Sequence, residues 1–316
     1  MKGIIVNADD FGPSPFINRG IIDGIEKGVI NSVSAFVTFN NECMDNISAL
    51  KKRIDEEFPH VKIGLHVSLT AGQPVHDPYT AVSSICYKRK PLDHFCPFKD
   101  IDVFEVDKTH LEAEIRAQVN RLGKALGGIE YIDHINSHLG IFNFYMPFWE
   151  AFTKITTEYN FPMRNPISAE HKRRILPPHH YIIPLPIEGY ALKQGLRDIE
   201  HPRTVLELIK GTNKNNLFLR EADAISKKIK MPAYFITHYY GKPGFGTLRK
   251  IVDAVQENEV VELMVHVGRG SYAGENFWGI DNNYYNTRID ELNFLVKPDF
   301  RNRMRDKGVE FANYPR

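Results

Sequence analysis

The sequence has few cysteines, no long hydrophobic run and almost no net charge. Only three cysteines occur among 316 residues, Cys43, Cys86 and Cys96, and none belongs to a CxxC pair. Three cysteines cannot all pair within one chain, which indicates either a reducing compartment or a chain that needs no disulfides. No stretch reaches the ~18 apolar residues that a transmembrane helix needs. The apolar run at the N-terminus is too short for a signal peptide and is followed at once by acids. We therefore expect a cytoplasmic protein that does not contact membranes.

The balance of charge also limits the partners to expect. The formal net charge is +1, with 40 Lys and Arg against 39 Asp and Glu. A balance this even gives no strong attraction to nucleic acid or to an anionic membrane. We expect a small-molecule partner instead, and a homodimer is the default expectation for the oligomeric state.

Short apolar runs alternate with amphipathic segments along most of the chain. The helical segments show apolar residues at helical spacing, and the segment that begins near residue 111 stops at Gly127. This pattern predicts strands at 3–6, 32–39, 61–65, 131–135, 233–237, 260–265 and 309–312. It predicts helices at 17–27, 111–126, 148–159, 248–255 and 287–296.

Alternating strands and helices are typical of an α/β fold with parallel strands. About seven such units fit an irregular (β/α) barrel, similar to a TIM barrel, better than an open doubly wound sheet. Neither GxGxxG nor GxxxxGK[ST] follows any predicted strand, which weakens a nucleotide-binding interpretation. We expect residues 1–316 to form one barrel domain with loop insertions at about 73–108 and 167–200. Loops of this length are usually lids or binding loops.

Polar residues follow the predicted strands where sites form in parallel α/β folds, at the carboxyl ends. The first strand is followed by Asn7, Asp9 and Asp10. Each of four later strands ends in one or more histidines or is followed by them: His66, His134 with His138, His238 and His266. A single histidine of this kind is more often structural, and an acid pair in a turn is more often a helix cap. Convergence of all of them on one edge makes a common site the better hypothesis.

The chemistry of these residues points to a divalent metal ion. Imidazole and carboxylate ligands together suit Zn²⁺ or a related divalent ion. A catalytic ion of this kind activates water, and a nearby carboxylate that is not a ligand can act as general base. A histidine opposite could supply the proton that a leaving amine or alkoxide needs.

Four sequence blocks contain these polar residues: NADDFG at 7–12, IGLHVSLTAGQP at 63–74, HINSH at 134–138 and VELMVH at 261–266. They resemble the four signature blocks of the YdjC-like carbohydrate deacetylases, and the second is similar to that family's GLHxxLTxGxP block. The best known members of the family remove an acetyl group from chitooligosaccharides. The resemblance covers nearly the whole chain, and it implies an irregular (β/α) barrel.

The resemblance also implies roles for individual residues. Asp10, His66 and His138 would bind one divalent metal ion, Zn²⁺ or Mg²⁺, and Asp9 would be the general base. The substrate would be an N-acetylated sugar or a short oligosaccharide. Aromatic residues of the two long loops are candidates to stack on sugar rings: Tyr79, Phe95, Phe98, Tyr181 and Tyr190.

Two further residues take their roles from the same resemblance. His266 stands where the family places its likely general acid, and Arg164 resembles the arginine of an Arg-x-Pro segment that would bind substrate or orient Asp9. The chain departs from the family at Asn136, where Asp is usual, and at Val267, where Pro is usual. These departures leave open a catalytically inactive carbohydrate-binding or regulatory relative. A phosphodiesterase or phosphatase on the same barrel would need a second metal site, for which the later predicted strand ends supply no acids.

Overall fold

The chain folds as alternating parallel strands and helices. The computed structural model describes residues 1–86, 105–143, 146–165, 228–236, 239, 243–271 and 282–316. The strands in these ranges are β1 (Lys2–Phe11), β2 (Ser32–Ala35), β3 (Lys62–Val67), β4 (Ile135–Ser137), β5 (Tyr234–Ile236), β6 (Val260–Val265) and β7 (Val309–Phe311). The α-helices are α1 (Pro15–Glu26), α2 (Asn41–Glu57), α3 (Lys108–Leu126), α4 (Met146–Glu158), α9 (Phe245–Ala254), α10 (Asn282–Leu295) and α11 (Pro298–Lys307). Short 3₁₀ helices are η1 (Tyr79–Ile85), η3 (Ile129–Tyr131) and η4 (His138–Asn143).

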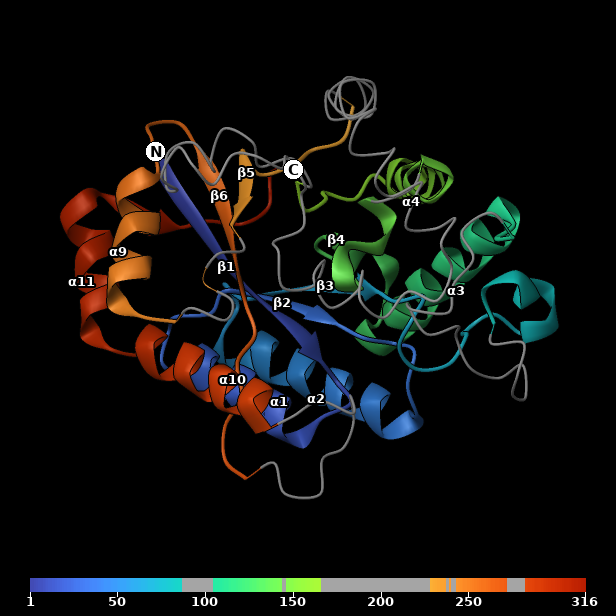
Figure 1. The fold of residues 1–316 in the computed structure, drawn as a ribbon, viewed down its shortest axis with the longest axis horizontal. Coiled ribbons are helices and arrows are strands. Elements are labelled where there is room, and N and C mark those ends of the chain that lie inside the picture. Colours follow the sequence, from blue (N-terminus) through green and yellow to red (C-terminus); the bar gives the residue numbers. More distant parts are fainter. Residues whose placement is uncertain (87–104, 144–145, 166–227, 237–238, 240–242, 272–281) are drawn as a thin grey trace.

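One parallel sheet organises the molecule around β1. Its strand order is β4-β3-β2-β1-β6-β5, and β7 pairs with the first residues of β1. Figure 1 shows this sheet curled, with α1, α2 and α10 along one side of it. The described part of the chain therefore forms a half-barrel, as expected for an irregular (β/α) barrel. All carboxyl ends of a parallel sheet lie at one edge, which is where this chain places its polar residues.

Local sequence signals set the ends of the helices that frame the sheet. The hydroxyl of Ser14 accepts a hydrogen bond from the Ile17 amide at 3.2 Å, and Pro15 occupies the first turn of α1. Both are typical of a helix start, because they satisfy or remove amides that lack a partner. Helix α3 ends before Gly127, which adopts a left-handed conformation with φ of 87°. Glycine takes this conformation without steric cost and ends the helix there.

The core lies between the sheet and these helices. Every residue of β1 after Lys2 is buried, as expected for a central strand covered on both faces. Helix α1 buries Ile17 and Ile21 against it, and each such side chain stabilises the fold by about 1.5–3 kcal/mol. A close approach fixes where α1 sits, because a Cβ on Gly20 would lie 2.5 Å from Gly268 Cα.

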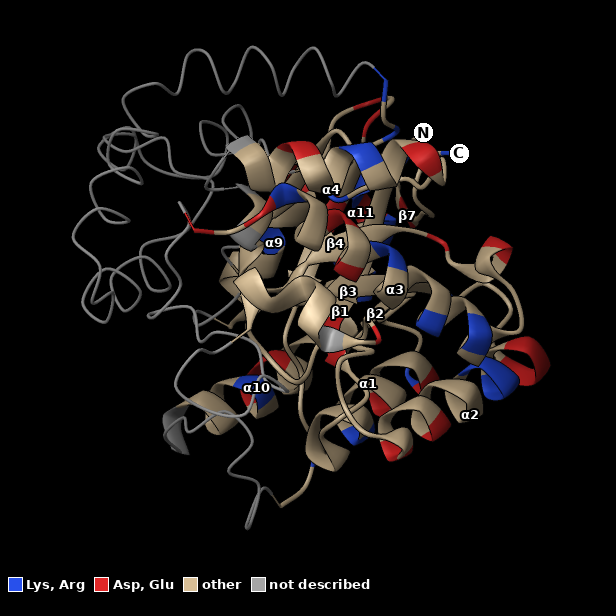
Figure 2. Ribbon diagram, turned by 90° about the vertical axis from the view of Figure 1, so that its right-hand side faces the viewer, with Lys and Arg blue, Asp and Glu red and all other residues tan. Residues whose placement is uncertain are grey.

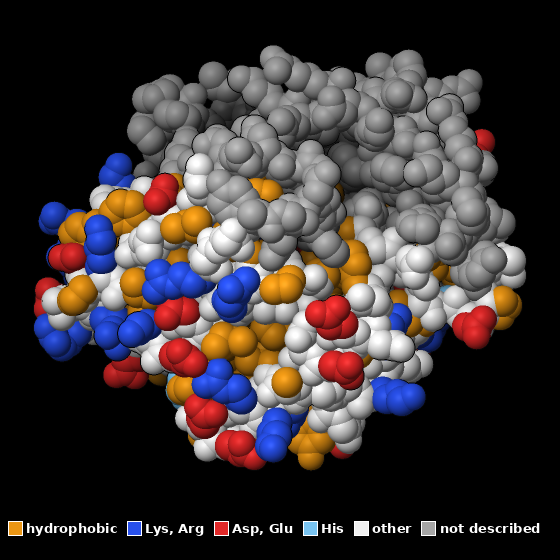
Figure 3. Space-filling view, turned by 90° about the horizontal axis from the view of Figure 1, so that it is seen from below, with side chains coloured by type: hydrophobic (Ala, Val, Ile, Leu, Met, Phe, Trp, Pro, Cys, Tyr) orange, Lys and Arg blue, Asp and Glu red, His pale blue; other side chains and the backbone are white. Residues whose placement is uncertain are grey.

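Charges of both signs are spread over the outer surface. Arg53 and Glu57 pair along α2, and Arg116 of α3 reaches Glu158 of α4, so Figure 2 shows basic and acidic residues side by side on these helices. On the face in Figure 3, basic and acidic side chains are likewise interspersed, with hydrophobic ones between them. No helix in the described ranges combines the length and apolar character that a membrane span requires.

The predicted elements agree with the observed ones in type and order, with three differences. The strand predicted at 131–135 is wrong in position, because residues 129–131 form η3 and β4 begins only at Ile135. His134 thus precedes β4 instead of following it, and it is buried. Helices α2 and α11 were not predicted. The insertion expected at 167–200 lies outside the described residues. Half of the insertion expected at 73–108, residues 87–104, does so too, and η1 lies in its described part.

Candidate metal centre

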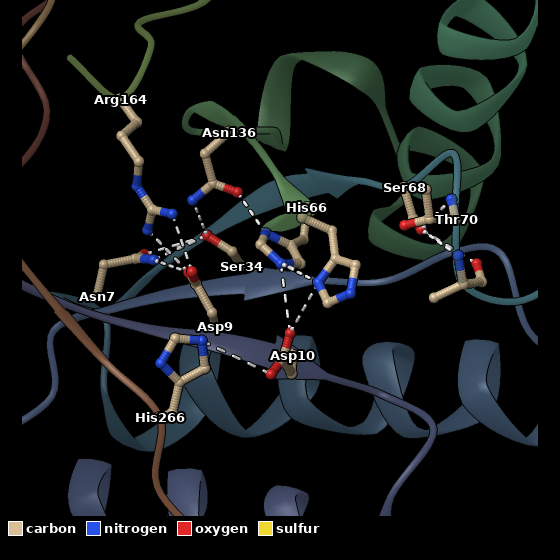
Figure 4. Close-up of polar contacts among 12 residues, drawn as sticks. Asn7, Asp9, Asp10, Ser34, His66, Ser68, Thr70, Asn136, Arg164 and His266 are labelled. Atoms are coloured by element: carbon tan, nitrogen blue, oxygen red, sulfur yellow. Dashed lines mark hydrogen bonds and ion pairs between the residues drawn. The ribbon is translucent and has the colours of Figure 1, made fainter. Parts of the chain in front are cut away.

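Asp9 and Asp10 lie at the end of the central strand, and both carboxylates reach the same site. Neighbouring side chains of a regular strand point to opposite faces. Asp10 departs from this rule with φ of 75°, and the pairing of β1 with β2 shifts register between Ala8 and Phe11. A bulge of this kind re-aims a side chain, and aspartate tolerates the left-handed region better than most residues. Figure 4 shows the result, with both acids at the edge of the sheet where His66 lies.

Three side chains from different strands meet around one carboxylate oxygen. His66 of β3 places Nε2 3.3 Å from Asp10 Oδ1, and His138, directly after β4, places Nδ1 3.6 Å from the same atom. The two ring nitrogens are 3.3 Å apart. One ligand atom from each residue lies within 4.8 Å of the others, which is a possible metal site.

The charge and hydrogen bonding of Asp10 fit a bound cation. Its Oδ2 accepts a hydrogen bond from Arg288, whereas Oδ1 is buried and accepts none. A buried carboxylate oxygen without a partner costs free energy, and a cation supplies that partner. Burial opposes ionisation, but Arg288 and the two histidines hold the pKa of Asp10 well below its usual range. Two imidazoles and one ionised carboxylate are a donor set suited to Zn²⁺ and related ions.

Asp9 belongs to a second buried group of charges beside the first. Arg164 donates to both carboxylate oxygens of Asp9 and also donates to Glu262 Oε1 from Nε at 2.7 Å. Burial raises the pKa of Asp9, but the charge and hydrogen bonds of Arg164, with smaller contributions from two histidines, lower it to about 2. The carboxylate is therefore ionised at neutral pH. The Arg164 guanidinium also lies 4.4 Å over the ring of Phe235, which limits its movement.

His266 lies on the opposite side of Asp10 from the other two histidines. It follows β6 directly, and its backbone amide donates to Glu291 Oε2 at 2.7 Å. Its Nε2 is 3.9 Å from Asp10 Oδ2 (Figure 4). Burial lowers the pKa of His266 to about 4, and the negative charge of Asp10 offsets this only in part. His266 is thus neutral near pH 7, close to the carboxylate that the other histidines share.

The structure brings all six predicted site residues to this edge of the sheet. They come from segments far apart in the sequence: Asp9, Asp10, His66, Arg164 and His266, which Figure 4 labels, and His138, which lies beside Asp10. His134 is buried at 0% exposure and does not face the candidate metal site, and His238 lies outside the described residues.

Sequence reasoning gave no site role to Arg288 and Glu262, which the structure adds. Glu262 could have been noticed, because it is a charged residue inside the otherwise apolar strand 260–265. Buried charges are paired or coordinate ions, so a carboxylate in a buried strand indicates a cationic partner. Arg288 carries no such signal, because it lies in a helix of mixed polarity and meets Asp10 from 278 residues away.

The described residues thus form an α/β half-barrel whose strand ends carry two histidines and an aspartate as a possible metal site. Residues 3–306 match the family model of the YdjC-like proteins, and the chain belongs to this family. The resemblance seen in the sequence blocks is therefore confirmed.

Several relatives of the chain are named as deacetylases. It is 27% identical over 170 residues to a carbohydrate deacetylase of Thermoanaerobacter pseudethanolicus, a match covering 52% of this chain and 61% of that protein. It is 33% identical over 135 residues to a chitooligosaccharide deacetylase of Proteus mirabilis, covering 43% and 48%. The matches thus span about half to three-fifths of the length of these relatives.

One solved structure is similar over almost the full length. It comes from Enterococcus faecalis V583 and is described as a candidate cellobiose-phosphate cleavage protein. The TM-score is 0.70 at 22% identity, and the match covers 99% of this chain and 97% of that one. At this identity the likeness establishes the fold alone.

Proposed function

We propose that this protein is a metal-dependent deacetylase that hydrolyses the acetamido group of an N-acetylated sugar or short oligosaccharide. The observation that carries the proposal is the meeting of Asp10, His66 and His138 around one carboxylate oxygen, with the ionised Asp9 beside them. The names of the relatives, which include carbohydrate and chitooligosaccharide deacetylases, support the substrate class.

Asp10, His66 and His138 would hold the divalent ion. When bound, such an ion lowers the pKa of water and polarises a carbonyl group. Asp10 would bind through Oδ1, because Arg288 already holds Oδ2. One such cluster occurs among the described residues, which favours one-metal chemistry over a two-metal phosphodiesterase.

Asp9 would accept the proton of the attacking water. It is ionised and is not part of the three-residue cluster, so its carboxylate is available as a base. The low pKa of Asp9 makes it a weak base. A weak base suffices for a water molecule whose own pKa a bound ion would lower. Arg164 would hold its carboxylate in one orientation while the proton is transferred.

The remaining steps need a proton on the leaving nitrogen. The water oxygen would bond to the acetyl carbon, the C–N bond would break, and the proton taken by Asp9 would pass to the nitrogen, giving a free amine and acetic acid, which ionises to acetate. His266 would relay this proton as general acid. Because its pKa near 4 keeps it neutral at pH 7, it must receive the proton within the cycle.

Acetate release is the direct test of this function. The purified protein is incubated with N-acetylglucosamine, its phosphate and short chitooligosaccharides, each with Zn²⁺, Mg²⁺, Mn²⁺ or a chelator. We expect metal-dependent acetate release from at least one of these sugars. Bound sugar without acetate under every metal would contradict the proposal and favour a carbohydrate-binding relative.

A further inference from the structure

A buried hydrogen-bond network lies directly behind the candidate metal ligand His66. His66 Nδ1 is 2.6 Å from Asn136 Oδ1, and Asn136 Nδ2 donates to Ser34 Oγ at 2.7 Å (Figure 4). Ser34 Oγ also lies 3.0 Å from His134 Nε2 and accepts from Asn7 Nδ2 at 2.9 Å. All five side chains are at most 1% exposed, so water does not compete for these bonds.

Carboxylates stand at two ends of this network, and an ionised carboxylate can only accept. Asp9 Oδ1 accepts from Asn7 Nδ2 at 2.7 Å, which fixes the orientation of that amide. Asp133 Oδ2 lies 3.4 Å from His134 Nδ1, which favours the proton of His134 on Nδ1. The ring of His134 is held in place because it stacks on Tyr314 at 4.0 Å.

The two ends together determine what Ser34 does in the middle. With its proton on Nδ1, His134 accepts at Nε2, and at 3.0 Å it is a nearer acceptor for the one hydroxyl proton of Ser34 than Asn7 Oδ1 at 3.3 Å. Ser34 then has only lone pairs to offer Asn136, which must donate through its amide nitrogen. The amide oxygen of Asn136 is left facing His66, and it requires a proton on His66 Nδ1.

We propose that Asn136 is a positioning residue that holds His66 as the Nδ1–H form, so that Nε2 is free to bind the metal ion. The inference rests on the proposed metal site but not on deacetylation. It agrees with the position of His66 Nε2, which faces Asp10 Oδ1 at 3.3 Å. Hydrogen bonds of this kind orient metal-binding histidines and tune their affinity.

The amide at position 136 suits this network in a way that a carboxylate does not. An aspartate there would accept from both sides, and it would compete with His134 for the single proton of Ser34. We therefore expect Asn136→Asp to keep His66 in the Nδ1–H form while His134 moves its proton from Nδ1 to Nε2. A merely structural role for Asn136 would leave the ring of His134 unchanged.

The test uses ¹⁵N-labelled protein saturated with Zn²⁺ and long-range ¹H–¹⁵N correlation of the histidine rings. In the native protein we expect His66 protonated at Nδ1 and bound to Zn²⁺ through Nε2, with His134 protonated at Nδ1. In Asn136→Asp the proton of His134 should appear on Nε2. A native His66 that binds through Nδ1, or a His134 ring unchanged in Asn136→Asp, would overturn the proposal.

Zn²⁺ affinity gives a second readout that is independent of catalysis. Asn136→Leu, which keeps the branched shape but removes both the acceptor for His66 and the donor to Ser34, should weaken Zn²⁺ binding about 10- to 100-fold. Ser34→Ala should weaken Zn²⁺ binding as well. Ser48→Ala is the matched control, because the exposed hydroxyl of Ser48 donates to the backbone carbonyl of Ala125 in α3, outside the network. Native affinity in folded Asn136→Leu would overturn the role of Asn136 alone. If the native protein itself does not bind Zn²⁺, the proposed metal site is wrong as well as the role of Asn136.

Discussion

Arg164 holds both oxygens of the Asp9 carboxylate. Its Nη1 donates to Oδ2 at 2.9 Å, and its Nη2 donates to Oδ1 at 2.8 Å (Figure 4). Glu262 binds the same guanidinium from the other side, through Nε at 2.7 Å. A bidentate pair fixes the plane of a carboxylate as well as its distance. The orientation of the proposed base is therefore set by one arginine.

We expect Arg164→Lys to reduce turnover about 100-fold, because lysine keeps the charge but cannot form the paired bonds, and misplacement by about 1 Å has an effect of that size. Acetate release at saturating substrate measures the effect. Arg116→Lys is the matched control, because Arg116 makes a similar two-bonded pair with Glu158 on the surface. Equal turnover in the two variants would show that the geometry of the Arg164–Asp9 pair does not matter.

Loss of Arg288 should destabilise the protein unless metal is present. Arg288→Met leaves the buried Asp10 carboxylate without its cation, and breaking a buried pair costs about 3–5 kcal/mol. Urea denaturation of metal-free protein should show this loss. Added Zn²⁺ should stabilise the variant more than the native protein, because it supplies the missing charge.

A suitable control for this experiment is Arg303→Met, which removes a surface pair with Asp253. Its denaturation midpoint should stay close to native and should respond to Zn²⁺ as the native protein does. A metal-free Arg288→Met protein with a native midpoint would contradict the role of Arg288.

Glu114 of α3 should hold the loop that follows β3. Its carboxylate accepts from the amides of Val75 and His76, each at 2.9 Å. In Glu114→Gln one acceptor becomes a donor, at a cost of about 1–3 kcal/mol, so these amides should exchange about 5- to 150-fold faster. Hydrogen exchange with mass spectrometry measures this. Glu112→Gln, on the same helix, alters a pair with Lys154 and should leave the loop unaffected.

The thiol of Cys43 should be inert in the folded protein. Burial raises its pKa to about 12. The reactive thiolate is therefore scarce at pH 8 and becomes abundant only at strongly alkaline pH. Iodoacetamide should label Cys43 at pH 8 only in denaturant, as peptide mass spectrometry would show. Rapid labelling of the folded protein would mean that the thiol is accessible.

The sequence predicted the edge of the sheet where the site lies, because polar residues at strand ends are a local signal. His66 and His266 stand at or directly after their predicted strands, and Asp9 and Asp10 end the first strand. The strand predicted at 131–135 overlaps β4 only at Ile135, because Tyr131 ends η3 and residues 132–134 lie between the two elements. Short apolar runs do not distinguish a strand from a helical turn.

What could not be predicted depends on contacts between distant segments. The left-handed conformation of Asp10, with φ of 75°, accompanies a register shift in the pairing with β2, a contact between distant segments. Arg288 meets Asp10 only once α10 is packed beside the sheet. The roles proposed for the two acids rest on these partners, since Arg288 holds Asp10 and Arg164 holds Asp9.

The most direct test of these roles compares metal content and acetate release in Asp9→Asn and His66→Ala. If Asp9 is the base and not a ligand, Asp9→Asn keeps native metal content while acetate release falls about 100- to 10,000-fold, the range for loss of a general base. His66→Ala should lose both metal and activity. Native acetate release by Asp9→Asn, or loss of its metal, would contradict the account.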